Sequence, residues 1–258
     1  MRSISAVIIA KDEADRLAPC VESCRPFADE IVVVDGGSTD GTPELARSLG
    51  CVVYENEWPG FGPQRNFGAD HAASDWIFWI DADEVVGTEL ARAVGEWKDG
   101  DPSGAPPALA VERVGDFMGR WLDAASERLV RLYDRRACRV SEVPVHEEVE
   151  GCKEPGQLGG RLWHYGFRSL SDHVVRFDRY TTLEAEKAWQ AGSRFSLWRL
   201  LWRPPARLFQ RFFVQRLYSR GVAGIAVCAL WFEYEVMREL KLWELAWRQG
   251  GGRHDASD

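Results

Sequence analysis

The sequence lacks the features that mark secreted, membrane-spanning or nucleic-acid-binding proteins. Its longest apolar run, from Gly221 to Phe232, has 12 residues, whereas a helix needs roughly 20 to span a bilayer. The apolar stretch near the N-terminus is too short for a signal-peptide core, and no small-residue cleavage site follows it. The formal net charge of −8 argues against general nucleic-acid binding, which needs a basic surface. We therefore expect a cytoplasmic protein without a nucleic-acid partner.

Cysteine pairs of the kind that bind zinc are also missing. The chain has six cysteines, and none of them forms a CxxC pair. This usage is typical of free thiols in a reducing compartment. We therefore expect neither a zinc site nor disulfides.

The first hundred residues alternate short apolar runs with amphipathic segments, which predicts an α/β domain around a mostly parallel sheet. Continuous apolar runs such as Ile31–Val34 suit strands that are covered on both faces. The expected strands are Ser5–Ile9, Glu30–Val34, Val52–Glu55, Trp76–Ile80 and Ala108–Val114. The expected helices are Ala14–Arg25, Thr42–Leu49, Gln64–Ala73 and Thr88–Lys98.

Acidic residues directly follow three of the expected strands. Asp12 and Glu13 come after the first strand, Asp35 after the second, and Asp81 after the fourth. In open parallel sheets, ligands bind outside the carboxyl ends of the strands, where the connecting loops converge. We therefore expect a ligand site at this edge of the sheet.

The segment Asp81-Ala82-Asp83 is the strongest candidate for metal binding. Mg²⁺ and Mn²⁺ prefer oxygen ligands, and one or two carboxylates with substrate phosphates can complete the coordination shell. The alternative is an acidic N-terminal cap for the helix that begins at Thr88. The other acidic loops expected at the same edge favour the metal site.

Two glycine-containing segments are further candidates. Asp35 and Ser38 lie in a glycine-rich turn, where Asp35 can accept hydrogen bonds from a base or ribose and Ser38 can cap the next helix. Arg65 follows Gly60-Phe61-Gly62-Pro63 near the start of another helix. Its guanidinium can balance an anionic ligand, or it can form a surface salt bridge. Neither segment is a dinucleotide or P-loop fingerprint.

Together these segments resemble family 2 glycosyltransferases of the GT-A fold over about residues 3–90. Within that family they resemble the bacterial branch that contains lipopolysaccharide inner-core β-1,4-glucosyltransferases. The segments that carry the resemblance are Ile9-Ala10-Lys11-Asp12-Glu13, Val34-Asp35-Gly36-Gly37-Ser38-Thr39-Asp40, Gly60-Phe61-Gly62-Pro63-Gln64-Arg65-Asn66 and Asp81-Ala82-Asp83-Glu84. The nucleotide-sugar-binding residues it implies are Ala10, Asp12, Glu13, Asp35, Ser38, Arg65, Asp81, Ala82 and Asp83. It also implies a divalent metal, Mg²⁺ or Mn²⁺, on Asp83 and Asp81.

Beyond residue 100 the resemblance rests on shorter segments. Arg128-Leu129-Val130-Arg131 resembles an Arg-Leu-Phe-Arg segment of the family, and Val145-His146-Glu147 resembles its Val-His-Glu. The family places a catalytic acidic group near this second segment, so Glu147 is our candidate base and Glu148 the second choice. The alternative is an ordinary strand and turn with solvated acids. His164 resembles a histidine that many GT-A enzymes present to the metal, although a histidine beside a tryptophan can also simply pack.

The resemblance implies an inverting transfer from a nucleotide-sugar, with UDP-hexose as the expected donor, to a glycolipid or polysaccharide such as lipopolysaccharide core. Two alternatives stay open. A sugar nucleotidyltransferase usually carries a glycine-rich loop after its first strand, whereas Ala10–Ala14 contains no glycine. A non-catalytic, membrane-associated nucleotide-binding scaffold could keep the same fold.

Charge divides the chain. Residues 1–150 carry 15 basic and 29 acidic residues, whereas residues 151–258 carry 17 and 11. We expect a catalytic GT-A domain over residues 1–192 and an α-helical extension over residues 193–250. The two parts are expected to meet different partners.

The C-terminal extension is rich in arginine and aromatic residues. From Arg194 to Arg220 there are seven arginines, seven aromatic residues and no acidic residue. Such helices lie on anionic membranes, so we expect a peripheral position on the inner face of the cytoplasmic membrane. The alternative is a helical bundle with solvated arginines. Pro204-Pro205 is expected to divide the stretch into two helical pieces, the second with Arg207, Arg211 and Arg216 on one side.

Overall fold

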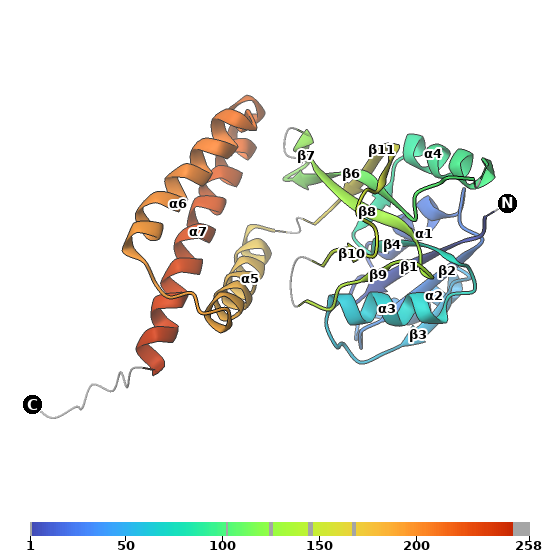
Figure 1. Cartoon of the computed structure of the whole chain (residues 1–258), viewed down its shortest axis with the longest axis horizontal. Helices are drawn as coiled ribbons and strands as arrows, with labels where there is room; N and C mark the ends of the chain where they lie inside the picture. The colour runs from blue at the N-terminus through green and yellow to red at the C-terminus, as the bar shows by residue number, and fades with distance from the viewer. Residues whose placement is uncertain (1, 102, 124–125, 144–146, 167–168, 250–258) are drawn as a thin grey trace, which may run out of the picture. The chain divides into compact units, whose positions relative to one another are not determined.

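A computed structural model describes residues 2–101, 103–123, 126–143, 147–166 and 169–249. The chain forms two compact units (Figure 1). The first, called the sheet unit, comprises residues 1–116 and 126–166, and the second, the helical unit, comprises residues 117–125 and 167–258. The helical unit thus begins earlier in the chain than the helical extension expected at residue 193.

The sheet unit is built on one mixed, mostly parallel sheet. Its strands are β1 (Ile4–Ala10), β2 (Glu30–Asp35), β3 (Val52–Glu55), β4 (Trp76–Asp81), β5 (Glu84–Val86), β6 (Ala108–Phe117), β8 (Glu127–Asp134) and β11 (Gly156–His164). Their order is β3-β2-β1-β4-β8-β6-β11-β5. β1 is parallel to β2 and β4, whereas β8 runs antiparallel to β4 and β6. A separate pair joins β9 (Arg139–Val140) to β10 (Val149–Glu150).

Apolar residues on both faces of the central strands form two core layers. Side chains alternate along a strand, so Ile4 and Ile8 of β1 enter one layer while Val7 and Ile9 enter the other. The first layer includes residues of α1 (Leu17–Cys24), α2 (Thr42–Ser48) and α4 (Thr88–Asp99), and the second includes residues of α3 (Phe61–His71). The predicted α/β class is therefore confirmed.

The predicted strands of the first hundred residues are confirmed to within a residue at each end, but two helices begin elsewhere. α3 begins at Phe61 rather than at Gln64, because Pro63 lies in the first turn, where no backbone donor is needed. α1 begins at Leu17 rather than at Ala14. The residues before it form a turn in which Arg16 and Leu17 both donate to the carbonyl of Glu13.

The described residues of the helical unit form three long helices around a small apolar core. Its elements are β7 (Arg120–Trp121), α5 (Leu170–Gln190), α6 (Leu197–Phe209), a π-helical turn (Gln210–Val214), a 3₁₀ turn (Leu217–Arg220) and α7 (Gly221–Gln249). Leu217, Val227 and Cys228 belong to the core, and Phe177 packs against it. Among the residues that the structure describes, no helix is both long and apolar enough to cross a membrane.

The expected break at Pro204-Pro205 is wrong, because α6 runs through both prolines. Each proline removes a helical hydrogen bond, but Pro204 is buried and ion pairs fasten α6 to α7 on either side of it. The chain leaves the helical path only at Arg216, which has a φ of 54°. Arg207 therefore lies on α6, Arg211 on the π-helical turn and Arg216 just before the 3₁₀ turn, rather than all three on one side of a second helix.

Candidate functional site

The loops after β1, β2 and β4 leave the same edge of the sheet. The register of the parallel strands sets Ala10 opposite Asp35 and Ile9 opposite Asp81. The acidic segments predicted to share an edge therefore do so, as the parallel topology requires. We call this edge the candidate site.

Asp35 holds the glycine-rich turn after β2 in shape. Its Oδ2 accepts hydrogen bonds from the backbone N–H groups of Gly37 and Ser38, each at 2.9 Å. The hydroxyl of Ser38 donates to Oδ1 of Asp35 at 2.5 Å. Asp35 is almost completely buried, so these bonds supply the partners that a buried carboxylate needs.

The first two loops are also bonded to each other. The backbone N–H of Asp12 donates to the hydroxyl of Ser38 at 2.8 Å, and the backbone N–H of Thr39 donates to Oδ1 of Asp12 at 2.7 Å. Asp12 has a φ of 54°, a left-handed conformation that aspartate tolerates better than most residues. The backbone N–H of Glu13 donates to Thr42 at 3.0 Å. These hydrogen bonds hold the segment from Ala10 to Glu13 against the loop after β2, so that the two form one fixed surface.

Two arginines hold the carboxylate of Asp81. The distance from Arg65 Nη2 to Asp81 Oδ1 is 2.7 Å, and that from Arg131 Nη2 to Asp81 Oδ2 is 3.7 Å. Both guanidiniums also lie over the ring of Trp79, with their carbons 4.2 and 3.7 Å from its centroid. Cations attract the face of an aromatic ring more strongly when they are desolvated. Asp81 therefore belongs to a buried charge cluster behind the candidate site.

Glu84 completes this cluster from the other side. It has no exposed surface, and its Oε1 lies 2.5 Å from Arg131 Nη2 and 3.3 Å from Arg113 Nη1. Its Oε2 accepts a hydrogen bond from the backbone N–H of Asp81 at 3.1 Å, which closes the turn that carries Ala82 and Asp83. Sequence reasoning assigned no role to Glu84 or Arg131. An arginine between apolar residues in a strand, as in Leu129-Val130-Arg131-Leu132-Tyr133, is a usable signal, because a buried charge must be paired.

The charges in the cluster shift one another's pKa. Burial acts to raise the pKa of Asp81, but the guanidiniums of Arg65 and Arg131 outweigh it and hold the pKa below its ordinary value. Burial dominates at Arg131 and lowers the pKa of its guanidinium. At Arg65 burial is outweighed by Asp81 and Glu147, which raise the pKa. Asp81 is therefore ionised at neutral pH.

Glu147 reaches the same cluster through Arg65. Its Oε2 lies 3.3 Å from Arg65 Nη1. Its Oε1 is buried and has no hydrogen-bond partner within the part of the chain that the structure describes. The neighbouring Glu148 is exposed. Val145 and His146, which precede Glu147 in the predicted motif, lie outside the described residues.

Asp83 and His164 lie side by side at the candidate site. His164 Nε2 is 3.3 Å from Asp83 Oδ2, and Arg16 Nη1 is 3.8 Å from the same oxygen. The antiparallel pairing of β11 with β5 sets His164 opposite Glu84, and the backbone N–H of Tyr165 donates to the carbonyl of Asp83 at 2.8 Å. The structure thus brings together Asp83 and His164, two of the three residues that the sequence marked as metal ligands, although they are 81 positions apart.

The side chains of Asp83 and His164 fit a divalent metal. A carboxylate oxygen and an imidazole nitrogen are both suitable ligands for ions such as Mn²⁺, and substrate phosphates and water can supply the remaining ligands. Within the described residues no group of three or more His, Cys, Asp or Glu side chains could hold a metal.

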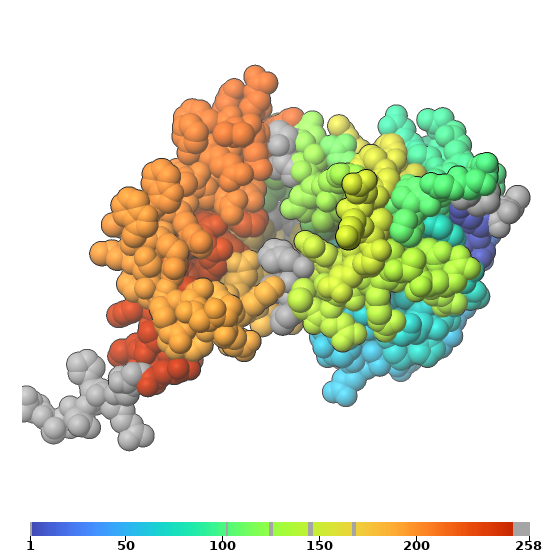
Figure 2. Space-filling model, viewed as in Figure 1, coloured from blue at the N-terminus to red at the C-terminus, as the bar shows by residue number. Residues whose placement is uncertain are grey.

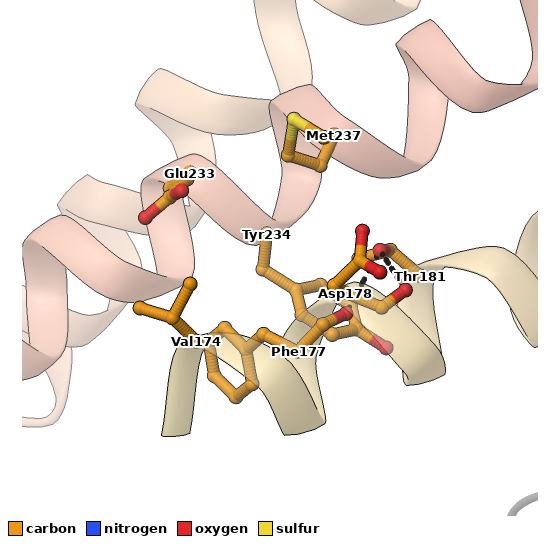
Figure 3. A pocket seen from close by; sticks show the side chains of 7 residues that line it. All are labelled: Val174, Phe177, Asp178, Thr181, Glu233, Tyr234 and Met237. Atoms are coloured by element: carbon orange, nitrogen blue, oxygen red, sulfur yellow. Dashed lines mark hydrogen bonds between the residues drawn. The ribbon is translucent and has the colours of Figure 1, made fainter. Parts of the chain in front are cut away.

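The helical unit has a separate pocket of about 200 Å³ between α5 and α7 (Figure 3). Its lining side chains are Val174, Phe177, Asp178, Thr181, Glu233, Tyr234 and Met237. The two charged groups among them are both acidic, whereas an anionic ligand needs basic groups or backbone donors. None of the residues predicted to bind the donor lines this pocket.

We expect Glu84→Gln to destabilise the protein strongly. The substitution leaves the buried Arg131 without its closest countercharge, and breaking a buried ion pair in this way costs about 3–5 kcal/mol. The measurement is the free energy of unfolding from urea titration followed by circular dichroism. The matched control is Glu96→Gln, which breaks an exposed pair with Arg92 and should change stability by less than about 1 kcal/mol. Equal losses in the two variants would contradict the structural role of the cluster.

The comparisons with known proteins identify relatives along most of the chain. It is 27% identical over 259 residues to an uncharacterised glycosyltransferase of Rickettsia typhi, covering 95% of this chain and 88% of the relative. It is also 27% identical over 259 residues to LpsC of Rhizobium meliloti, a lipopolysaccharide core biosynthesis glycosyltransferase, covering 93% and 92%.

Among solved structures, glucosyl-3-phosphoglycerate synthase from Mycobacterium tuberculosis, in complex with Mn²⁺, UDP and glucosyl-3-phosphoglycerate, is 25% identical with a TM-score of 0.37. The match covers 45% of this chain and 44% of that one. The sequence profile of glycosyl transferase family 2 matches residues 5–147. This range contains the loops after β1, β2 and β4 as well as Glu147, and the match confirms the GT-A fold expected from the sequence. The chain therefore belongs to glycosyl transferase family 2.

Proposed function

We propose that this glycosyltransferase moves a hexose from a nucleotide-sugar, with UDP-hexose as the first donor to test, to a glycolipid or polysaccharide acceptor such as lipopolysaccharide core. The observation that carries the proposal is the position of Asp83 and His164 next to each other at the carboxyl edge of the sheet. The name of the relative LpsC supports the class of acceptor. We also propose that the protein works at the inner face of the cytoplasmic membrane, where a lipid-linked acceptor would be held.

The nucleotide part of the donor would bind over the cross-linked loops after β1 and β2. Asp12, Glu13 and Ser38 lie in these loops, and Ala10 and Asp35 are the last residues of β1 and β2. The carboxylates of Asp12 and Asp35 accept hydrogen bonds from the loops themselves. We therefore assign these two residues chiefly to shaping the surface that meets the base and ribose. A surface already fixed before binding reduces the ordering cost of binding.

The diphosphate would lie at the turn after β4. Asp83 and His164 would hold the divalent metal, which supplies positive charge to the leaving diphosphate. We assign the metal to Asp83 and His164 rather than to Asp81, because Asp81 is engaged with Arg65 and Arg131. Arg16, which lies beside Asp83, is an additional basic group for the diphosphate.

Glu147 is the proposed general base of an inverting, single-displacement reaction. The acceptor hydroxyl must lose its proton as its oxygen attacks the anomeric carbon and the bond to the diphosphate breaks. Oε2 of Glu147 is oriented by Arg65, whereas Oε1, which has no hydrogen-bond partner among the described residues, can accept this proton. Arg65 therefore acts as a positioning residue between the base and Asp81.

The test of the function is a donor screen with the purified protein. Nucleotide release from UDP-, GDP- and ADP-sugars is measured with Mn²⁺ or Mg²⁺ and again with a chelator. We expect release from a UDP-hexose that depends on the metal and increases when a lipopolysaccharide-core acceptor is added. Silence across all donors with metal present would favour a non-catalytic scaffold.

Asp83→Asn should weaken metal-dependent donor binding. The substitution removes a negative charge from one of the two protein ligands that we assign to the metal. Donor affinity is measured by calorimetric titration with and without Mn²⁺, and the variant should lose the difference between the two. The control Asp75→Asn changes a half-exposed aspartate at the opposite end of β4 and should bind as the parent does. Unchanged Mn²⁺-dependent affinity in Asp83→Asn would refute the assignment.

Glu147→Gln should reduce turnover by roughly 10²–10⁴-fold while donor affinity stays nearly the same, because the variant lacks only the general base. Turnover is measured at saturating donor and acceptor. Glu148→Gln is the matched control, since Glu148 is exposed, and it should retain most of the activity. A larger loss in the control than in Glu147→Gln would transfer the role of base to Glu148.

A further inference from the structure

α6 and the π-helical turn after it present an apolar surface to solvent, which we call the α6 face. Its members are Leu197, Trp198, Leu201, Trp202, Leu208, Phe209, Phe213 and Val214, all of them exposed. Trp198 and Trp202 are 72% and 60% exposed, and their rings are stacked with an interplanar angle of 6°. This segment, coloured orange, lies at the surface of the helical unit (Figure 2).

The opposite side of α6 carries arginines, two of which pair with buried glutamates of α7. Arg199 Nη2 lies 2.9 Å from Glu239 Oε1, and Arg207 Nε lies 3.2 Å from Glu235 Oε1. Both glutamates are on α7, and they are only 1% and 3% exposed. A surface helix of a water-soluble protein normally buries its apolar side and exposes its charges. In α6 this arrangement is inverted.

An inverted helix indicates that something apolar covers its outer side. Contiguous exposed apolar patches are rare on monomeric soluble proteins, and larger ones mark interaction sites. The arginines of α6 cannot simply turn outward and take the apolar residues in, because the buried Glu239 would lose the countercharge of Arg199. The buried Glu235 would keep only Arg238 of its two arginine partners. The α6 face is therefore fixed in its outward orientation by the ion pairs behind it.

Charge selects the kind of partner. From Lys187 to Phe232 the chain contains no acidic residue, so nothing in this segment repels a negatively charged surface. Arg203 and Arg216 are exposed. Tryptophan beside leucine, with arginine on the other side of the helix, is the composition of helices that lie in the interfacial region of anionic bilayers. α6 has 13 residues, which is too short to span a bilayer but suits a helix that lies flat.

We propose that the α6 face docks on the surface of an anionic membrane, with its tryptophans and leucines below the lipid headgroups. The sequence predicted a membrane contact through the seven arginines of this stretch. The proposed contact is instead made by one defined apolar face, since Arg199 and Arg207 form ion pairs within the helical unit. The inference deepens the proposed function, because a lipid-linked acceptor needs an enzyme held at the membrane. It rests on that function only for the reason why the protein would dock.

The test is co-sedimentation of the full chain with vesicles of phosphatidylcholine alone or mixed with phosphatidylglycerol, at low and physiological salt. We expect binding to the anionic vesicles and a blue shift of tryptophan fluorescence. The double variant Trp198→Gln, Trp202→Gln should bind about tenfold more weakly or worse. The matched control Trp243→Gln, Trp247→Gln also changes two exposed tryptophans four residues apart, on α7, and should bind within about twofold of the parent.

Three results would overturn the docking proposal. One is no binding to anionic vesicles at low salt, and another is equal loss of binding in the two double variants. The third is a dimer in light scattering that the Trp198→Gln, Trp202→Gln variant dissociates, since a second copy would then cover the α6 face. Nucleotide release from a soluble donor is measured on the same preparations. Release without vesicle binding refutes docking alone, and binding without release refutes the proposed function alone.

Discussion

The buried charge cluster behind the sheet edge is the constraint on which the candidate site depends. Arg131 and Glu84 have almost no exposed surface, and each is the closest partner of the other. Charges taken out of water are tolerated only when they are paired with good geometry. Because Glu84 also binds the backbone of Asp81, the pairing fixes the turn that presents Asp83. The site is therefore held in place by the buried ion pairs beneath it and by the pairing of the strands beside it.

Arg65 connects this cluster to the chemistry. Its guanidinium joins Asp81 to Glu147, so the turn that would meet the diphosphate and the proposed base share one rigid cation. Glycosyl transfer requires both to be held in a fixed relation to the sugar, since small misplacements of reacting groups greatly reduce rates. In the helical unit, ion pairs do not position a site but keep an apolar surface exposed. There the pairs of Arg199 and Arg207 are on the inner side of α6 and leave its apolar side to the solvent.

Much of the sheet unit could be predicted from the sequence, because its signals are local. An apolar run such as Ile31–Val34 forms a buried strand wherever it is covered on both faces, and the residues that follow such strands occupy one edge of the sheet. The helix boundaries were harder to predict. Pro63 fits inside the first turn of α3, and α6 continues through Pro204 and Pro205 because packing against α7 offsets the lost hydrogen bonds. The rule that proline ends a helix considers only the local backbone and therefore cannot predict this effect of tertiary packing.

The sequence by itself determined the strands, the acidic loops at their ends and the family to which they point, since each depends on a short contiguous segment. Only the tertiary structure decided which side chains meet. The pairing of β11 with β5 brings His164 to Asp83, and the buried position of Arg131 makes it a partner of Glu84. Periodicity predicts that α6 has an apolar side and a basic side, but it does not predict which of the two sides faces the interior. Buried glutamates on α7, far along the chain, pair with Arg199 and Arg207 and so leave the apolar side of α6 outward.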